Sequence, residues 1–141
     1  MQTNRYVVQV VQGNTSTQTT TTSTSYSDTG LTASITPQLS TSKVLVVVKQ
    51  RLFRAPNAVC AVNLYRDSAD VSPVVAVTRY GLTDETSTGD GDALMFTFLD
   101  SPSTTSSVTY KTVFKRTSGS GTIYAQLDSN ISTISLMEIV Q

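Results

Sequence analysis

Short runs of alternating apolar and polar residues are the feature that most restricts the fold of this chain. In the run 31–36, leucine, alanine and isoleucine alternate with threonine and serine, and Pro37 follows. A period of two places one set of side chains on one face of a strand, and proline cannot donate to a strand ladder. Other strand-like runs, some alternating and some apolar on both faces, are separated by turn-forming residues and occur at 6–12, 43–53, 58–66, 74–80, 93–99, 108–117, 122–127 and 131–140. Because no stretch has the period of a helix, the sequence predicts one all-β domain over 1–141, an antiparallel sandwich of about nine or ten strands.

The segment 14–25 is composed almost entirely of threonine and serine. The chain has 24 Thr and 19 Ser, and only 14% of its residues are charged. Threonine is β-branched and tolerates an extended backbone, so the segment is either a solvated loop or an edge strand. We favour a strand through its latter half, continuing into Tyr26. We expect Gly13 to end the strand before it and residues 28–30, Asp-Thr-Gly, to form a turn.

The run 43–53 is the most hydrophobic of the predicted strands. Residues 44–48 are Val-Leu-Val-Val-Val, so the alternation is lost there. Continuous apolar character means that both faces of a strand are covered. We therefore expect this strand to lie at the centre of the sandwich or against another subunit.

A polar corner joins two predicted strands at residues 100–107. Phe96 and Phe98 alternate with Thr97 and Leu99, and Asp100-Ser101-Pro102 follows. Aspartate can accept a hydrogen bond from backbone N–H groups just beyond it, and proline restricts the residue before it. The sequence predicts that Asp100 caps this corner.

Few residues are suited to catalysis or metal binding. The chain has no histidine, and its single cysteine, Cys60, lies in an apolar run, where we expect a buried and unreactive thiol. The carboxylates gather in one Gly-rich loop, at Asp84, Glu85, Asp90 and Asp92. Such a loop can bind calcium, but its spacing does not fit an EF-hand, so we expect a solvated loop. We assign no catalytic, cofactor-binding or metal-ligating residue and expect the protein not to be an enzyme.

The charge balance gives no reason to expect a nucleic acid or a membrane as partner. Ten basic and ten acidic residues give a formal net charge of zero. The basic residues near aromatic ones are expected to be ordinary strand ends; they are Arg51, Arg54, Lys115 and Arg116. Asn14 and Asn130 match the glycosylation sequon, but no apolar secretion signal follows the N-terminus, so neither is assigned as a site.

Six tyrosines are spread over six predicted strands. They are Tyr6, Tyr26, Tyr65, Tyr80, Tyr110 and Tyr124. Aromatic faces can line a glycan-binding surface, but tyrosine also packs in cores with its hydroxyl hydrogen-bonded. Because the six are dispersed, packing is the interpretation we favour.

Several motifs, taken in order, resemble those of a family of phage proteins. The chain begins with Val-Val-Gln-Val-Val-Gln at 7–12 and continues with Ser-Tyr-Ser-Asp-Thr-Gly-Leu-Thr-Ala-Ser-Ile-Thr-Pro at 25–37. Thr-Ser-Lys-Val-Leu-Val follows at 41–46, Phe-Leu-Asp-Ser-Pro at 98–102, Thr-Tyr-Lys at 109–111 and Ile-Ser-Leu-Met-Glu-Ile at 134–139. In this order they resemble tailed-bacteriophage virion structural proteins with compact β-sandwich domains. The resemblance covers nearly the whole chain and is weakest over 54–92.

The resemblance implies a jelly-roll-like homotrimer on the virion, made in the host cytoplasm. Related domains serve as capsid decoration, or cement, proteins and as tail-fibre tips. A decoration protein would bind the major capsid protein and stabilise the shell; a fibre tip would recognise a host surface glycan. Because a strand begins by Tyr6, we expect no attachment segment or shaft, and the decoration protein is the interpretation we favour. Leu136 on one face of the last strand, with Met137 and Ile139 on the other, independently favours a trimer.

Overall fold

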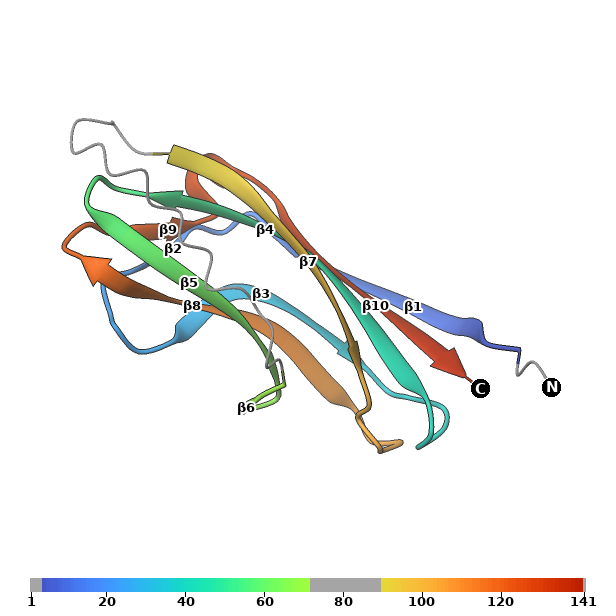
Figure 1. Cartoon of the computed structure of the whole chain (residues 1–141). Helices are drawn as coiled ribbons and strands as arrows, with labels where there is room; N and C mark the ends of the chain where they lie inside the picture. Colours follow the sequence, from blue (N-terminus) through green and yellow to red (C-terminus); the bar gives the residue numbers. More distant parts are fainter. Residues whose placement is uncertain (1–3, 72–89, 141) are drawn as a thin grey trace.

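The computed structural model describes residues 4–71 and 90–140, and within them two antiparallel β-sheets pack as a sandwich (Figure 1). This confirms the predicted all-β, antiparallel architecture and its number of strands. The ten strands and one short 3₁₀ helix, in chain order, are β1 (Tyr6–Thr15), β2 (Thr19–Thr21), β3 (Ser27–Ile35), β4 (Lys43–Arg54), β5 (Ala58–Arg66), β6 (Ala69–Asp70), β7 (Asp90–Asp100), β8 (Val108–Gly119), β9 (Ile123–Ala125), η1 (Leu127–Ser129) and β10 (Ser132–Val140).

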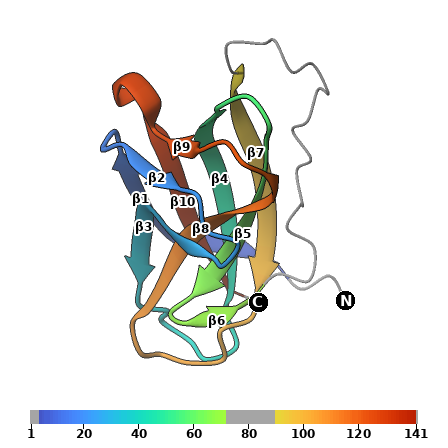
Figure 2. The same cartoon turned by 90° about the vertical axis from the view of Figure 1, so that its left-hand side faces the viewer.

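The six-stranded sheet is organised around β4. Along one edge β4 pairs with β7 from Val44 to Arg54; along the other it pairs first with β10 and then, from Leu52, with β9. Outside these lie β1, which pairs with β10, and β2, which pairs with β9. The central position predicted for 43–53 is therefore confirmed. The second sheet has the order β3-β8-β5-β6, and the two layers face one another in a jelly-roll-like arrangement (Figure 2).

The core between the sheets consists of two apolar clusters separated by a polar layer. Along β4, Val48 belongs to one cluster and Leu52 to the other, with buried Gln50 between them. Thr112 has the same place on β8, and its hydroxyl donates to Oε1 of Gln50 at 2.7 Å. The layer continues through Thr29, Ser132 and Gln126, and all three side chains hydrogen-bond within it. Because every member has a partner inside the chain, this buried polar layer holds both sheets in one register.

The first strand does not end at Gly13 as predicted. It continues to Thr15, and a Cβ atom on Gly13 would lie 2.0 Å from the carbonyl oxygen of Thr32 on β3. Glycine is therefore required here for the close approach of the two sheets. The expectation that Gly13 breaks the strand was wrong because the constraint comes from a distant segment.

Two further local expectations were wrong. Residues 28–30 form a bulge inside β3, where the register with β8 shifts between Asp28 and Thr32 and Gly30 has φ of 87°, rather than a turn. The Thr-rich segment does contain an edge strand, β2, but it ends at Thr21 instead of continuing into Tyr26. The side chains of Thr21 and Ser23 accept from backbone N–H groups two residues on, which bends the chain.

The remaining differences lie at element ends. The predicted strand 122–127 is shorter, because η1 follows β9, while β7 and β8 are longer than expected. The short β6 was not predicted and lies between the predicted strands 58–66 and 74–80. The predicted strand 74–80 lies outside the described residues.

Candidate functional site

The outward face of the six-stranded sheet has an apolar row that crosses four strands. Val10 lies opposite Met137, Met137 opposite Leu45, and Leu45 opposite Leu99. Residues paired in this way project from the same face of a sheet. We call the apolar outward side chains around this row the apolar band; its members are Val7, Val10, Leu45, Val47, Met95, Leu99, Met137 and Ile139.

The two ends of the apolar band are strongly exposed. Val10 on β1 is 59% exposed, and Met95 and Leu99 on β7 are 68% and 49% exposed, whereas Leu45 and Met137 between them are half-buried. Single exposed apolar residues are ordinary, but a contiguous exposed set marks an interaction surface. The band is therefore the described surface best suited to contact with another macromolecule.

Charged side chains flank the two middle rows of the apolar band. The row through Leu45 and the next row, formed by Gln12, Ser135, Val47 and Thr97, contain no charged residue. On β4, Lys43 lies on one side of these rows and Lys49 on the other, and Lys43 Nζ donates to Ser101 Oγ at 2.5 Å. A partner can cover the two rows without burying a charge.

On the inward face of β10, Glu138 is fully buried. Its carboxylate accepts from Gln9 Nε2 at 2.5 Å and from the backbone N–H of Gln38 at 2.7 Å, with Leu39 N at 3.4 Å. Burial raises the pKa of the Glu138 carboxyl, but these donors outweigh it, so the pKa lies below its usual value. The carboxylate thus ties the loop between β3 and β4 to β1 and β10, which is a structural role.

Asp100 does not cap the corner as predicted. It occupies an inward position on β7, where Arg66 Nη1 donates to its Oδ2 at 2.5 Å and the Tyr110 hydroxyl donates at 2.6 Å. Burial, followed by the hydrogen bond to Asp100, raises the pKa of Tyr110. The group connects β7 to β5 and β8 of the other sheet and closes that end of the sandwich.

These buried ionic contacts were missed at the sequence level. The sequence does place both charged residues at inward positions. Asp100 follows Phe96 and Phe98 on the apolar face of one run, and Arg66 follows Leu64 on the apolar face of another. A charged residue at an inward position needs a partner. The identity of that partner, 34 positions away, depends on the pairing of the sheets.

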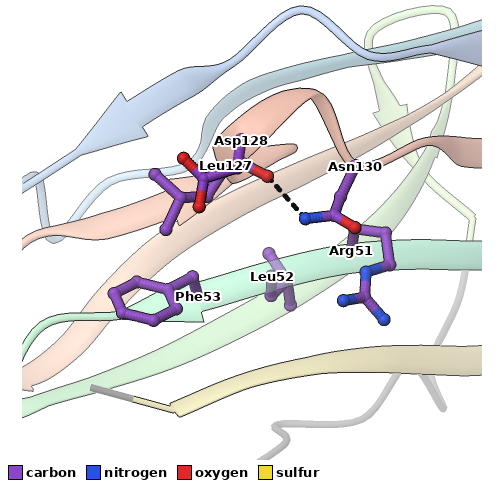
Figure 3. A pocket seen from close by; sticks show the side chains of 6 residues that line it. All are labelled: Arg51, Leu52, Phe53, Leu127, Asp128 and Asn130. Carbon is purple, nitrogen blue, oxygen red and sulfur yellow. Dashed lines mark hydrogen bonds between the residues drawn. The ribbon is translucent and has the colours of Figure 1, made fainter. Parts of the chain in front are cut away.

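A small pocket of about 90 Å³ lies at the far end of the outward face, between β4 and the segment around η1 (Figure 3). It is lined by Arg51, Leu52, Phe53, Leu127, Asp128 and Asn130. Asn130 Nδ2 donates to the carbonyl of Leu127 at 2.8 Å, and the Phe53 ring forms an edge contact with Tyr124, the centroids 5.8 Å apart. A guanidinium, a carboxylate and an amide beside an aromatic pair can bind a small polar molecule such as a sugar.

The backbone around this pocket has an uncommon conformation. Gln126, Asp128 and Ser129 have φ values of 55°, 54° and 59°, in the left-handed region that non-glycine residues rarely adopt. Gln126 is held there by its buried side chain, which contacts Ser132 Oγ at 2.8 Å, and by its N–H, which donates to the Arg51 carbonyl. Backbone strain of this kind is concentrated at functional sites, although it does not identify a ligand.

The tyrosines do not form one common surface. Tyr26 and Tyr65 make an edge contact on the outward side of the second sheet, with Lys115 Nζ 4.4 Å from the Tyr26 ring centroid. Tyr110 is buried, Tyr124 lies beside Phe53, and Tyr6 is 61% exposed on β1. Tyr80 lies outside the described residues.

The other residues considered in the sequence are dispersed. Cys60 is buried, as expected, and burial raises the pKa of its thiol. Arg54 is buried, and Arg116 donates to the carbonyls of Ser120 and Gly121, so the basic residues form no common patch with Arg51.

The two sequon asparagines lie at different places, Asn14 within β1 and Asn130 at the pocket. Of the acidic loop, Asp84 and Glu85 lie outside the described residues, while Asp90 and Asp92 begin β7. In the described part of the chain, no cluster of three or more Cys, Asp or Glu residues is placed to hold a metal ion. Nor does any helix there have the length and apolar character needed to span a membrane.

Comparison with known proteins gives a fold likeness only. No family model matches the chain, and no curated protein matches it. A chain from the structure of infectious bursal disease virus, Gt strain, is similar over 93% of this chain, with a TM-score of 0.44 and 13% sequence identity. This protein spans 40% of the length of that chain. A likeness of this size carries no argument about function.

Proposed function

We propose that the protein is a virion structural protein of a tailed bacteriophage, a decoration protein that binds the outer surface of the capsid as a homotrimer. Its main support is the ordered set of motifs that resembles such proteins. The observation in the structure that supports the proposal is the apolar band, because an exposed apolar surface on a closed sandwich fits the association of copies that a homotrimer requires.

The mechanism we propose is thermodynamic. A protein that binds the assembled shell but not its separated subunits stabilises the shell by mass action. Three copies joined together would contact the shell at three places, so modest individual contacts would add by avidity. No chemical step is required of any side chain.

A non-enzymatic role is part of the proposal. The described carboxylates that are buried, Asp100 and Glu138, are engaged in contacts that hold the sandwich together. Glycoside hydrolysis, a reaction found on related architectures, needs two carboxylates facing one sugar across about 5–10 Å. Asp100 and Glu138 are committed to other partners and do not supply such a pair.

The test is to compare phage particles with and without this protein. We expect particles that lack it to release their genome at a lower temperature while still adsorbing to host cells, measured by nuclease sensitivity of the DNA during heating. Imaging of the particle should place the protein on the head. Unchanged heat resistance together with lost adsorption would contradict the proposal.

A tail-fibre tip that binds a host glycan is the second candidate, and the pocket beside η1 supports it. Arg51, Asp128 and Asn130 offer charged and hydrogen-bonding groups next to the Phe53 ring. If this function holds, Phe53→Ala and Asp128→Ala should reduce adsorption of phage to host cells without altering the heat resistance of the head. Normal adsorption by both variants would exclude the pocket as the receptor site.

A further inference from the structure

We infer that the apolar band is the surface on which a second copy of this chain binds, in a head-to-tail ring where the β7 end of one copy contacts the β1 end of the next. This inference deepens the proposed function by assigning the surface through which the copies of the trimer contact one another. The number of copies rests on that proposed function. The shell would then contact a different surface.

The composition of the band favours a second copy over a foreign partner. Its two middle rows contain only apolar, hydroxyl and amide side chains, with Met137 and Leu45 at the centre. Interfaces between identical subunits are more apolar than those of transient complexes, and charged residues are depleted in their cores. Lys43 lies opposite Ile139 and Lys49 opposite Met95, so the charges stand at the margins of the band, whereas an acidic partner would be expected to meet cations in its middle rows.

The size of the face also fits a protein subunit. About 20 side chains project outward from β1, β10, β4, β7 and β9, and a stable interface uses roughly 20–30 residues on each side. A small ligand would cover only one row of the sheet. In a ring this face is shared between contacts with two neighbours, so each copy commits about as many residues in total as one side of a standard interface.

The distribution of exposure favours a ring. The most exposed members of the band lie at its two ends, Val7 and Val10 on β1 and Met95 and Leu99 on β7. In a threefold ring each copy must present two different patches, since a head-to-tail contact joins unlike surfaces. The two exposed ends are such a pair, and they lie on opposite edges of the same sheet.

Disulfide cross-linking of the purified protein tests the arrangement. Val10 and Leu99 lie in one row three strand spacings apart, about 14 Å, which is too far for a disulfide within one chain. In the double variant Val10→Cys/Leu99→Cys, oxidation should therefore give covalent trimers after free thiols are blocked. Cys60 is 2% exposed and should form no cross-link in the folded protein.

Control variants make the result specific. Ser34→Cys/Ala69→Cys places two thiols at exposed positions on opposite edges of the other sheet and should give no trimer. Covalent products that stop at dimers, or dimers formed by Val10→Cys alone, would overturn the ring in favour of a twofold contact. A folded double variant that forms no cross-link would overturn the assignment of the surface. This test uses the purified protein and no phage particle. The decoration role could therefore fail in the heating test while cross-linking confirms the ring. The ring could equally fail in cross-linking while the heating test confirms the decoration role.

Discussion

The two faces of β10 both depart from the usual pattern of a sheet, but in opposite ways. Inward, the strand carries Glu138 and Ser132 among apolar residues; outward, it carries Met137 and Ile139 beside Thr133 and Ser135. The inward polar groups all have hydrogen-bond partners inside the chain, whereas the outward apolar side chains remain partly exposed. The inward face therefore serves the stability of one protomer, and the outward face is suited to a contact between protomers.

This contrast predicts which substitutions should affect folding and which should affect assembly. Removing the partner of a buried polar group lowers the free energy of unfolding, since the remaining group is desolvated without a hydrogen bond. An exposed apolar side chain contributes little to folding and much to association. Inward substitutions should therefore lower the free energy of unfolding more than outward ones.

Asp100→Ala should be the most damaging of these substitutions. It leaves the Arg66 guanidinium and the buried Tyr110 hydroxyl without their common acceptor, and breaking a buried ion pair costs about 3–5 kcal/mol. Because Arg66 is partly exposed to water, we expect the lower end, about 3 kcal/mol, in urea unfolding. Tyr110→Phe removes only one donor and should cost about 1 kcal/mol. Equal stability of the Asp100→Ala variant and the wild type would show that the inward contacts contribute nothing.

Glu138→Gln should cost about 2 kcal/mol, because it removes a charged acceptor from three donors. The wild type should also show a pH dependence that the variant lacks. The pKa of Glu138 is lower in the folded chain than in the unfolded one, so its contribution is present above about pH 4.3, the unfolded value, and is lost as pH falls through the folded pKa. Urea midpoints measured between pH 3 and 7 check both points; parallel pH profiles for the two proteins would refute the assignment.

Leu99→Thr on the outward face should have the smallest effect on the isolated protomer. The side chain is 49% exposed, and substitutions at such positions usually change stability by within about 0.5 kcal/mol. The unfolding midpoint should be measured at a dilution where the protein is a single chain. A loss comparable to that of Glu138→Gln would mean that the band belongs to the protomer core instead of an interface.

Local patterns in the sequence predict most of the strands, since burial of one face imposes a period of two. Val44 to Val48 correctly predicted a central strand, and the alternation at Leu31 to Ile35 correctly predicted a half-buried one. The strand that continues through Gly13 was not predictable, because the glycine is required by the carbonyl of Thr32 in the other sheet. Local patterns do not contain that information.

The same limit applies to the candidate site. Met137 and Ile139 were recognised as facing away from Leu136, and this part of the outward face was visible in the sequence. Val10 and Leu99 extend the same row because the strands lie in the order β1-β10-β4-β7. The alternation of apolar and polar residues does not predict that order. The pocket depends on the backbone conformation of residues 126–129, for which glycine, the usual signal, is absent.

The most direct measurement is the molar mass of the purified protein in solution, by light scattering, for the wild type and for Leu45→Lys/Met137→Lys. We expect three times the 15.1 kDa of one chain for the wild type and a single folded chain for the variant, because two ammonium groups in the middle row cannot be buried unpaired. A matched control, Thr32→Lys/Ser34→Lys on the outward face of the second sheet, should retain the wild-type mass. A wild type that remains a single chain at high concentration, or a trimer that survives both lysines, would contradict the account.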